Sequence, residues 1–258
     1  MMTFKFICEY DGTNFQGWQR QSPTATNKNP RTTQAVVEDA LSKYFRQSIK
    51  VVASGRTDSG VHALGQVCSF EVGTEEFEPD RAVQAVNHFL PSDVSIRNLE
   101  RASAGFNARF SAKRKTYVYK CYVSRTRRAV DNTYHHMLHS LPNINHIKRA
   151  SKHFVGTHDF TAFSCPDTAV TDKVRTIYSL EVAEIPPTPG NPYQELCFVI
   201  EGDGFLRNMV RIIVGTLLDV GFGKIEPDSI PEILLQKDRM HAGSTAPAKG
   251  LVLLNVGY

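Results

Sequence analysis

Apolar residues recur along the first hundred residues with two different spacings, which predict strands and helices in alternation. Phe4, Phe6, Cys8 and Tyr10 alternate with other residues over 3–10, a pattern typical of a half-buried strand. Spacings of three and four after Thr32 or Thr33, either of which can cap a helix, predict a helix that packs an apolar stripe on a sheet. The same two patterns predict strands over 49–53, 66–72 and 94–99 and a helix over 80–90. The order strand–helix–strand–strand–helix–strand is typical of ferredoxin-like and RNA-recognition folds, with an antiparallel sheet and helices on one face.

The second half of the chain repeats this theme more loosely. Residues 115–123 alternate strongly and predict a long basic strand that carries several tyrosines. A proline-rich turn separates two further strand patterns and predicts a hairpin. The remaining expected segments are a helix over 144–155, an irregular stretch over 156–163, hairpin strands over 174–185 and 195–202, a very apolar helix over 205–220, a short helix over 229–236 and a closing strand over 251–256. We therefore expect an α+β fold of two halves, 1–108 and 109–258, with a ligand site in a cleft between them.

Composition places the chain among globular proteins and gives no sign of a membrane segment. Of its 258 residues 41% are hydrophobic and 22% charged, and no stretch approaches the roughly 18 apolar residues that a membrane span needs. The first residues lead into a strand pattern without a signal-peptide profile, so we expect a cytoplasmic protein. The five cysteines are odd in number and widely spaced, which predicts reduced core residues. No cysteine or histidine pair has zinc-ligand spacing, and we expect no metal site.

Positive charge is concentrated in one part of the chain although the net charge is only +4. Such clustering indicates a polyanion partner such as RNA, and a solvated surface fits it equally well. The cluster lies between about 110 and 150 and comprises Lys113, Arg114, Lys115, Arg125, Arg127, Arg128, Lys148 and Arg149.

A loop between two predicted strands, over 53–63, carries one carboxylate between two glycines. Gly55 and Gly60 permit backbone angles that other residues resist, and Arg56 and His62 add polar chemistry around Asp58. A turn that only reverses the chain does not need so many functional groups. Asp58 is therefore a candidate catalytic residue, with a turn-capping side chain as the alternative. Trp18 follows another turn, and we expect it to act as a packing anchor.

Two residues of the second half complete a set that suits chemistry on an RNA base. Arg211 lies in the apolar helix pattern, four residues after Arg207 and so on the same face near the expected helix start. A buried arginine needs a carboxylate partner, for which Asp58 is a candidate; the alternative is a side chain that extends to solvent. Tyr117 on the basic strand is either a core residue or a surface on which a base stacks.

The chain resembles the bacterial tRNA pseudouridine synthase A family over nearly its whole length. The likeness rests on separated segments in a fixed order, of which the Arg-Thr-Asp loop is the most specific. They are Tyr10-Asp11-Gly12-Thr13 with Gly17-Trp18-Gln19, Gly55-Arg56-Thr57-Asp58 with Gly60-Val61-His62-Ala63 and Gly65-Gln66-Val67, Phe106-Asn107-Ala108-Arg109-Phe110, the Tyr117/Tyr119 strand, Gly156-Thr157-His158-Asp159-Phe160-Thr161-Ala162-Phe163, Met209-Val210-Arg211 with Val214-Gly215, and Ala246-Pro247-Ala248-Lys249-Gly250-Leu251.

The resemblance implies a pseudouridine synthase fold and an isomerase that converts uridine to pseudouridine in the tRNA anticodon arm, around positions 38 to 40. By likeness, Asp58 is the essential aspartate that attacks the target nucleotide at the sugar or at the ring. Arg211 pairs with this aspartate, Tyr117 stacks on the target base, and Arg56 enters the helical stack and helps to flip the nucleotide. The resemblance also implies a homodimer that uses no cofactor or metal.

Two departures from the family limit what can be carried over. The polar loop over 21–31 is longer than expected, so its contacts are not inherited; a surface loop and an RNA contact are both open. Arg207 and Asn208 stand where we associate histidines with close relatives, and neither inherits a role. The competing functions are a non-catalytic tRNA-binding or chaperone protein on the same fold and a glycosidase, which ordinarily needs a second acid opposite the first.

Overall fold

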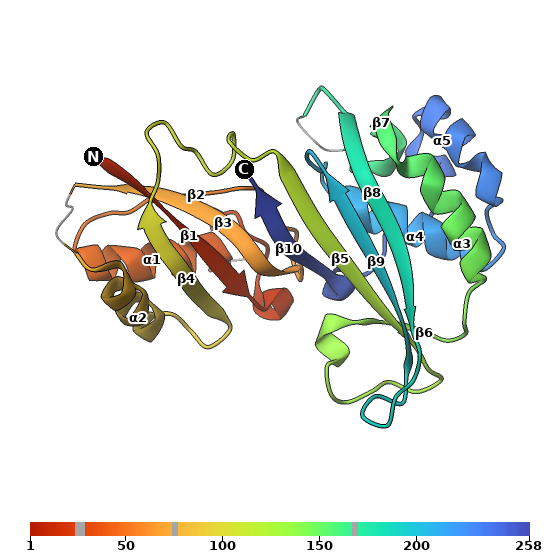
Figure 1. Cartoon of the computed structure of the whole chain (residues 1–258), viewed down its shortest axis with the longest axis horizontal. Helices are drawn as coiled ribbons and strands as arrows, with labels where there is room; N and C mark the ends of the chain where they lie inside the picture. The colour runs from red at the N-terminus through yellow and green to blue at the C-terminus, as the bar shows by residue number, and fades with distance from the viewer. Residues whose placement is uncertain (24–28, 74–76, 167–169) are drawn as a thin grey trace. The chain divides into compact units, whose positions relative to one another are not determined.

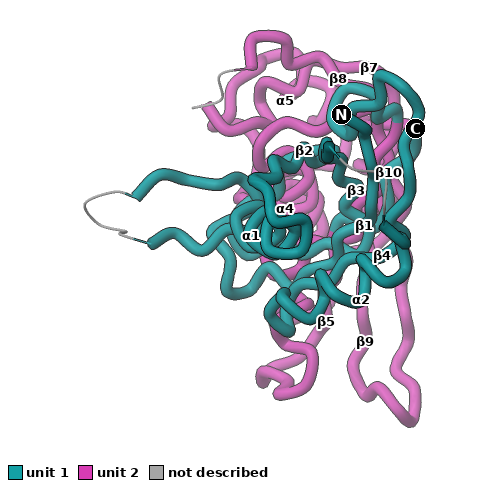
Figure 2. Tube along the Cα trace, turned by 90° about the vertical axis from the view of Figure 1, so that its left-hand side faces the viewer, with its two compact units in different colours: residues 1–113, 253–258 teal, residues 114–252 magenta. Residues whose placement is uncertain are grey.

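The computed structural model describes residues 1–23, 29–73, 77–166 and 170–258. The chain divides into two compact units, coloured separately in Figure 2: unit 1 is Met1–Lys113 with Leu253–Tyr258, and unit 2 is Arg114–Val252. The sequence assigned the whole C-terminal segment to the second half. The last residues, Leu253–Tyr258, instead belong to unit 1; most of them lie in the closing strand β10 (Leu251–Gly257).

Unit 1 has the predicted order of strands and helices. It contains β1 (Met2–Tyr10), α1 (Thr33–Phe45), β2 (Val51–Ala53), β3 (His62–Val72), α2 (Pro79–Phe89) and β4 (Val94–Arg101), with a short 3-10 helix, η1 (Gly12–Asn14), after β1. Strand β1 lies between β4 and β3, and β2 pairs with the far side of β3, all antiparallel. The ferredoxin-like arrangement predicted for this half is confirmed.

The core of unit 1 follows the alternation read from the sequence. Phe4, Phe6, Cys8 and Tyr10 are buried, while their neighbours on β1 are half-exposed. Helices α1 and α2 lie side by side on one face of this sheet (Figure 1). Trp18 is only 2% exposed and tilts against Tyr10, with ring centroids 5.8 Å apart, which confirms its role as a packing anchor.

In unit 2 antiparallel strands follow the order β5-β9-β8-β7, and β6 pairs in parallel with β5. Helices α3 and α4 pack against one another, and α3 also contacts β8 (Figure 1). The predicted hairpin of β8 and β9 is confirmed. The elements are β5 (Arg114–Val123), β6 (His136–Leu138), α3 (Ile144–Ser151), β7 (Gly156–Asp159), β8 (Val174–Ile185), β9 (Gln194–Gly202), α4 (Met209–Gly221) and α5 (Ile230–Gln236), with 3-10 helices η2 (Asn132–Tyr134), η3 (Lys152–Phe154), η4 (Thr161–Phe163), η5 (Pro227–Ser229), η6 (Arg239–His241) and η7 (Ala248–Gly250).

Several predicted boundaries were wrong. The stretch 156–163, expected to be irregular, forms β7 and η4, because β7 pairs with β8 and gains backbone partners that local sequence does not reveal. Helix α4 begins at Met209 rather than at 205, since Asn208 adopts a left-handed backbone (φ 63°) that interrupts the helix. Arg207 is therefore outside α4 and shares no helix face with Arg211. Thr32 is the residue before α1, but its side chain makes no capping hydrogen bond.

The structure also bears on the cysteines, on metal sites and on membrane segments. All five cysteines are free; Cys8, Cys68 and Cys121 are buried as expected, whereas Cys165 and Cys197 are partly exposed. Among the described residues no cluster of histidine, cysteine, aspartate or glutamate could hold a metal ion. No helix in the described part of the chain combines the length and apolar character needed to cross a bilayer. Residues 24–28 of the predicted 21–31 loop lie outside the described residues, and the rest of it contains no helix or strand.

Candidate active site

The loop between β2 and β3 carries Asp58 and is anchored chiefly through its neighbour Thr57. Thr57 is 7% exposed, and its hydroxyl lies 2.8 Å from the Tyr10 hydroxyl. Its carbonyl oxygen accepts a hydrogen bond of 3.1 Å from the Trp18 backbone N–H. Asp58 itself is half-buried, and its backbone carbonyl closes the turn by accepting from the Val61 N–H at 3.1 Å. The loop is thus held by buried groups on either side of the carboxylate-bearing residue.

Both ends of the loop have further fixed contacts. At its start, the Ser54 hydroxyl donates to Gln66 Oε1 at 2.5 Å, and Gln66 Nε2 donates to the Gly55 carbonyl at 2.8 Å. At its end, the Gly60 N–H and the Ser59 hydroxyl donate to the Phe15 carbonyl at 3.3 and 3.1 Å. Gly60 has a φ of 79°, which confirms that the loop uses the backbone freedom of this glycine.

Two glycines of the segment after β1 allow it to lie directly against the loop. A Cβ atom on Gly12 would lie 2.0 Å from the Val61 carbonyl oxygen, and one on Gly17 would lie 2.8 Å from that of Thr57. Gly17 also has a positive φ of 86°. Neither position tolerates a side chain without movement of the loop backbone.

His62 begins β3 and connects it to the same segment. Its Nδ1 accepts from the Gly12 N–H at 3.0 Å, and Asp11 Oδ1 lies 3.1 Å from the same nitrogen. One ring nitrogen cannot accept from Gly12 and donate to Asp11 at once. The hydrogen bond from Gly12 requires a bare Nδ1, whereas an ion pair with Asp11 requires a protonated one.

Arg56 precedes Thr57 on this loop and is exposed. The sequence-predicted residues Arg56 and Asp58 therefore share one loop of unit 1, on either side of a buried anchor. Tyr117 and Arg211 belong to unit 2.

Tyr117 lies on β5, opposite Ile200 of β9, and is 7% exposed. Its ring meets that of Phe205 edge to face, with centroids 5.3 Å apart at an angle of 87°. This contact limits rotation of the tyrosine ring about its side-chain bonds. The ring is thus largely buried, and Phe205 packs against it.

Arg211 is half-buried. Its Nε donates to the Ala246 carbonyl at 2.8 Å, and Nη1 donates to Asn208 Oδ1 at 3.0 Å. The Ala246 N–H in turn donates to the Arg211 carbonyl at 3.0 Å. Two fixed oxygens thus set the orientation of the guanidinium plane.

The sequence did not identify Asn208, Ala246 or Tyr119 as parts of this arrangement. The Tyr119 hydroxyl donates to the Pro247 carbonyl at 2.9 Å, beside the Ala246 contact of Arg211. Burial raises the pKa of Tyr119 far above its ordinary value, and the nearby Arg211 cation only partly opposes this effect. Tyr119 is therefore a neutral donor that fixes this backbone segment.

Glycines also bring the segment around residue 246 onto α4. A Cβ on Gly215 would lie 1.8 Å from the Ser244 carbonyl oxygen. The Gly243 N–H donates to the Thr216 hydroxyl at 2.9 Å. The two glycines, both visible in the sequence, were the available signal that another segment approaches this helix.

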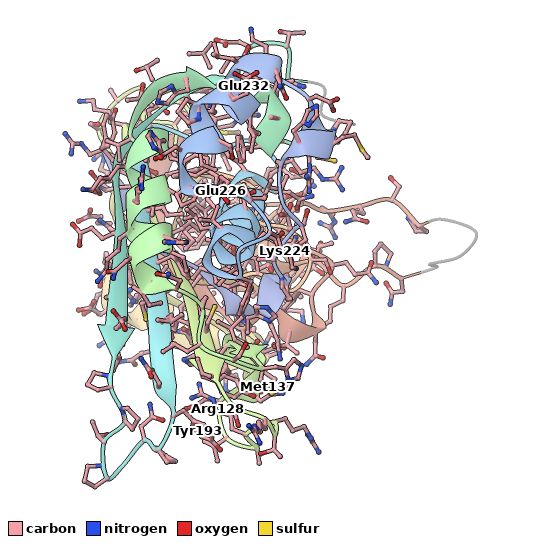
Figure 3. The ribbon with its side chains drawn as sticks, turned by 90° about the vertical axis from the view of Figure 1, so that its right-hand side faces the viewer. Arg128, Met137, Tyr193, Lys224, Glu226 and Glu232 are labelled. Atoms are coloured by element: carbon pink, nitrogen blue, oxygen red, sulfur yellow. The ribbon has the colours of Figure 1, made fainter. Side chains whose placement is uncertain are left out.

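Arg128 does not belong to an exposed basic surface. It is 7% exposed, and its Nη1 pairs with Glu195 Oε1 at 2.6 Å. The faces of Tyr122 and Tyr193 lie 4.6 and 5.6 Å from the guanidinium carbon, and Figure 3 shows Arg128 beside Tyr193. The prediction that Arg128 contributes to a polyanion-binding cluster was wrong, because its charge is used inside unit 2.

A pocket of about 350 Å³ lies in unit 2, between residues 224 and 241 (Figure 3). It contains none of the four predicted site residues. Its lining residues are Lys224, Ile225, Glu226, Ser229, Glu232, Ile233, Gln236 and His241.

A family model described as tRNA pseudouridine synthase matches residues 7–111 and 150–258. The chain belongs to the tRNA pseudouridine synthase family. Curated relatives agree over the full length: the tRNA pseudouridine synthase A 1 of Bacillus cereus is 43% identical, covering 100% of this chain and 99% of its own. The tRNA pseudouridine synthase A of Acetivibrio thermocellus is 42% identical over 100% of both chains, and that of Bacillus subtilis is 43% identical over 100% and 99%.

Among solved structures, a Cbf5-Nop10-Gar1 complex matches 81% of this chain and 46% of that chain, with 16% identity and a TM-score of 0.34. The membership in the tRNA pseudouridine synthase family thus rests on sequence, and the resemblance drawn from the separated motifs is confirmed. The family match includes Arg56, Asp58 and Arg211, whereas Tyr117 lies between the two matched ranges.

Proposed function

We propose that this member of the tRNA pseudouridine synthase family isomerises uridine to pseudouridine in the tRNA anticodon stem-loop, at positions 38, 39 and 40. The observation that carries the proposal is the full-length match to relatives named tRNA pseudouridine synthase A. The anchored Asp58 loop adds support, since a nucleophile must be held in a fixed geometry.

The reaction exchanges one bond to the ribose for another. The bond from uracil N1 to the sugar C1′ breaks, the base rotates, and a bond from C5 to C1′ forms. The proton on C5 leaves to solvent and N1 gains a proton, so no atoms or electrons are added overall. Asp58 supplies the nucleophile, either at C1′ or at the ring, and lets the base detach from the sugar.

In this proposal Arg211 pairs with the Asp58 carboxylate and favours its ionised form. Its bonds to Ala246 and Asn208 support the role, because they leave the guanidinium few orientations. Tyr117 stacks on the target base, and its edge-to-face contact with Phe205 presets the ring plane. Arg56, exposed next to the Thr57 anchor, enters the stack that the target uridine leaves.

The direct test uses unmodified tRNA whose uridines carry tritium at C5. Pseudouridine formation releases this tritium to water and leaves a new nucleoside in the digested tRNA. We expect both signals from the unmutated protein and neither from Asp58→Ala or Asp58→Asn. Binding of tRNA without tritium release by the unmutated protein would favour the non-catalytic tRNA-binding alternative, and product from Asp58→Ala would remove Asp58 as the nucleophile.

Arg56 is tested separately because its role is in flipping rather than in bond formation. Arg56→Ala is expected to lose turnover while it retains most of its affinity for tRNA. Arg56→Lys keeps the charge and loses the planar group, and so separates phosphate attraction from insertion. A variant with normal turnover would exclude Arg56 from the site.

Position, assembly and location belong to the same proposal. Mapping pseudouridine in tRNA from cells with and without the protein tests positions 38, 39 and 40. Sedimentation of the purified protein with and without tRNA tests the homodimer that the resemblance implies. Fractionation of those cells tests the cytoplasmic location.

A further inference from the structure

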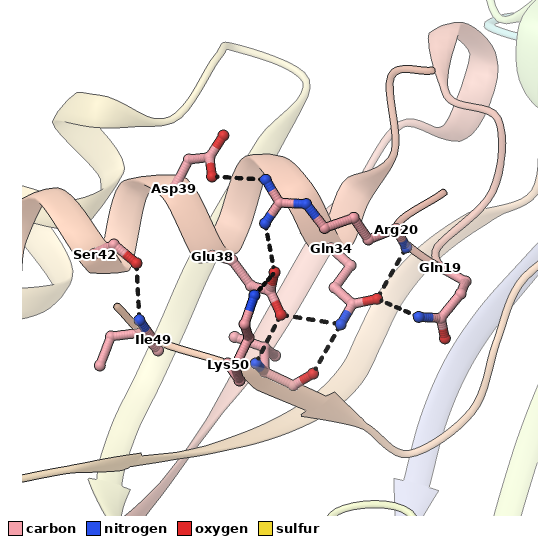
Figure 4. Close-up of polar contacts among 9 residues, drawn as sticks. Gln19, Arg20, Gln34, Glu38, Asp39, Ser42, Ile49 and Lys50 are labelled. Atoms are coloured by element: carbon pink, nitrogen blue, oxygen red, sulfur yellow. Dashed lines mark hydrogen bonds and ion pairs between the residues drawn. The ribbon is translucent and has the colours of Figure 1, made fainter. Parts of the chain in front are cut away.

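A buried carboxylate lies at the centre of a polar network in unit 1 (Figure 4). Glu38 on α1 is 2% exposed, and its Oε2 accepts from Arg20 Nη1 at 2.8 Å. Its Oε1 accepts from Gln34 Nε2 at 3.0 Å and from the backbone N–H of Val51 at 3.1 Å. Lys50 Nζ lies 3.8 Å from Oε2. One acid therefore joins three segments of the chain.

The location of this acid is informative because burial of a carboxylate is costly. Such a group is retained in a core only where charge and hydrogen bonds compensate its lost hydration. An apolar residue at position 38 could fill the same space on α1, but it would leave the Val51 N–H without an acceptor. The contacts of Glu38 indicate that the network fixes the segments around it.

One of these segments, residues 17–20, is hydrogen-bonded to the Asp58 loop. Gln34 Oε1 accepts from Gln19 Nε2 at 2.8 Å and from the Arg20 N–H at 2.9 Å. The backbone N–H of Gln34 donates to the Trp18 carbonyl at 3.0 Å, and the Trp18 N–H donates to the Thr57 carbonyl at 3.1 Å. Segment 17–20 thus connects the network to the residue that precedes Asp58.

The other segment is the strand from which the loop departs. Val51 begins β2, where it pairs with Phe70 of β3. Immediately after β2, the Ser54 N–H donates to the Val67 carbonyl at 2.8 Å, and the loop begins. Glu38 is therefore bonded to both segments that hold the loop: to segment 17–20 through Arg20, and to β2 through Val51.

We propose that Glu38 and Arg20 are positioning residues for the Asp58 loop. Their ion pair keeps segment 17–20 in register with β2 and so sets the place of Thr57 and of Asp58 after it. The inference rests on the proposed function, in which Asp58 is the nucleophile. Displacement of a reacting group by about 1 Å lowers turnover by as much as 100-fold, although the change lies far from the chemistry.

The test compares two acid-to-amide changes at the two partners of Arg20. Glu38→Gln removes the buried charge, and Asp39→Asn removes the exposed partner, whose Oδ1 lies 3.2 Å from Arg20 Nη2 and whose side chain is 61% exposed. We expect Glu38→Gln to lower kcat for uridine isomerisation by roughly 10- to 100-fold and to change KM for tRNA by less than about twofold. Asp39→Asn is expected to keep both constants.

The chain contains a single tryptophan, which reports on the same segment without any added label. Trp18 is 2% exposed and donates to Thr57. We expect Glu38→Gln to shift Trp18 emission and to increase its quenching by acrylamide at temperatures where the protein remains folded. A general loss of stability would leave the native emission unchanged.

Arg20→Gln is the second variant, for use if Glu38→Gln does not fold. Arg20 is 43% exposed, and its removal leaves Gln34 and Val51 bonded to Glu38. The same loss of kcat with retained KM and the same change in Trp18 emission are expected. A large rise in KM with normal kcat would instead show that Arg20 contacts tRNA, and would overturn the positioning role.

A folded Glu38→Gln protein with normal kcat and normal Trp18 emission would also overturn the inference. Failure of the proposed function is distinguishable, since the unmutated protein would then release no tritium. In that case the emission of Trp18 in Glu38→Gln and Asp39→Asn still decides whether the network holds the loop.

Discussion

Arg211 and Arg128 illustrate two ways in which an arginine is accommodated in this chain. Arg211 is half-buried and bonded to a backbone carbonyl and an amide oxygen. Arg128 is buried and has a carboxylate partner in Glu195. The bonds of Arg211 to two neutral oxygens fix the orientation of its guanidinium group, whereas the Glu195 carboxylate neutralises the charge of Arg128.

Asn208 gives a test of how Arg211 is oriented. Its left-handed backbone is tolerated by asparagine and glycine, and its Oδ1 accepts from Arg211. Asn208→Gly removes only the side-chain acceptor. We expect kcat to fall about tenfold, because one hydrogen bond to a charged group is worth roughly that factor. Asn208→Ala should show the same kcat and also lose about 1 kcal/mol of stability from its backbone. Kinetics on tRNA and urea denaturation measure the two effects, and normal kcat in Asn208→Gly would contradict the role.

Arg128 gives a test of stability alone. Arg128→Met leaves Glu195, whose side chain is only 12% exposed, without its cation, and we expect the free energy of unfolding to fall by about 3 kcal/mol, the lower end of the loss for a buried pair. Adding Glu195→Gln should recover part of this loss, because it removes the uncompensated charge. Urea denaturation of the single and double variants measures both changes. If Arg128→Met and the double variant were equally stable, the charge of Glu195 would be compensated without Arg128, by water or by Asn191, which donates to it at 3.0 Å. That result would contradict the prediction.

At the scale of elements, short segments are held by close backbone approach to their neighbours. The segment after β1 reaches the Asp58 loop through Gly12 and Gly17, and the segment before β10 reaches α4 through Gly215 and Gly243. At Gly12, Gly17 and Gly215 a backbone carbonyl occupies the space of the missing Cβ, and at Gly243 the Thr216 backbone and the Asp219 carboxylate occupy it. These glycines bring polar backbone groups to both sets of predicted site residues.

Gly17 and Gly105 form a matched pair for testing this arrangement. Both have a positive φ, 86° and 76°, but a Cβ on Gly17 would lie 2.8 Å from the Thr57 carbonyl, whereas one on Gly105 meets nothing within 4 Å. Each change to alanine costs about 1 kcal/mol from the backbone conformation. We expect only Gly17→Ala to lose turnover as well, by at least tenfold, because the Asp58 loop must move. Tritium release and urea denaturation compare the two, and equal turnover would contradict the prediction.

At the scale of the whole molecule, each of the two compact units has its own buried core. Buried polar clusters make the stability of these cores depend on pH. Burial and the Arg128 cation lower the pKa of His135, although Glu195 opposes them, and burial and Lys249 lower that of His136. Burial alone would raise the pKa of Glu195, but hydrogen bonds from Arg128 and Asn191 outweigh it and the pKa falls.

These shifts predict a loss of stability in acid. A lowered histidine pKa means that the unfolded chain binds the proton more tightly, so stability is complete above about pH 6.5 and falls as the pH drops below it. The lowered pKa of Glu195 adds a further loss below its ordinary value of about 4.5. We expect the urea midpoint to decrease between pH 7 and pH 5, and to decrease less in His135→Gln. A midpoint independent of pH over that range would contradict the prediction.

The sequence by itself determined the features that depend on near neighbours. Alternation over 3–10 and helical spacing after Thr32 are local patterns, and they determined the ferredoxin-like order of unit 1 and the hairpin of β8 and β9. The Asp58 loop was also identifiable, because its polar residues and glycines are contiguous. Membership of the family followed from the same motifs.

Only the tertiary structure decided which distant groups meet. Arg211 bonds to Ala246, 35 residues away, and Arg128 to Glu195, 67 residues away. Glu38 is buried on a helix whose pattern gives no reason to expect an acid there. Local periodicity records whether a position faces the core, but a buried charge is compensated by whichever segment the fold brings beside it. For that reason the positions of the loop and the strands were predictable, whereas the partners that hold them were not.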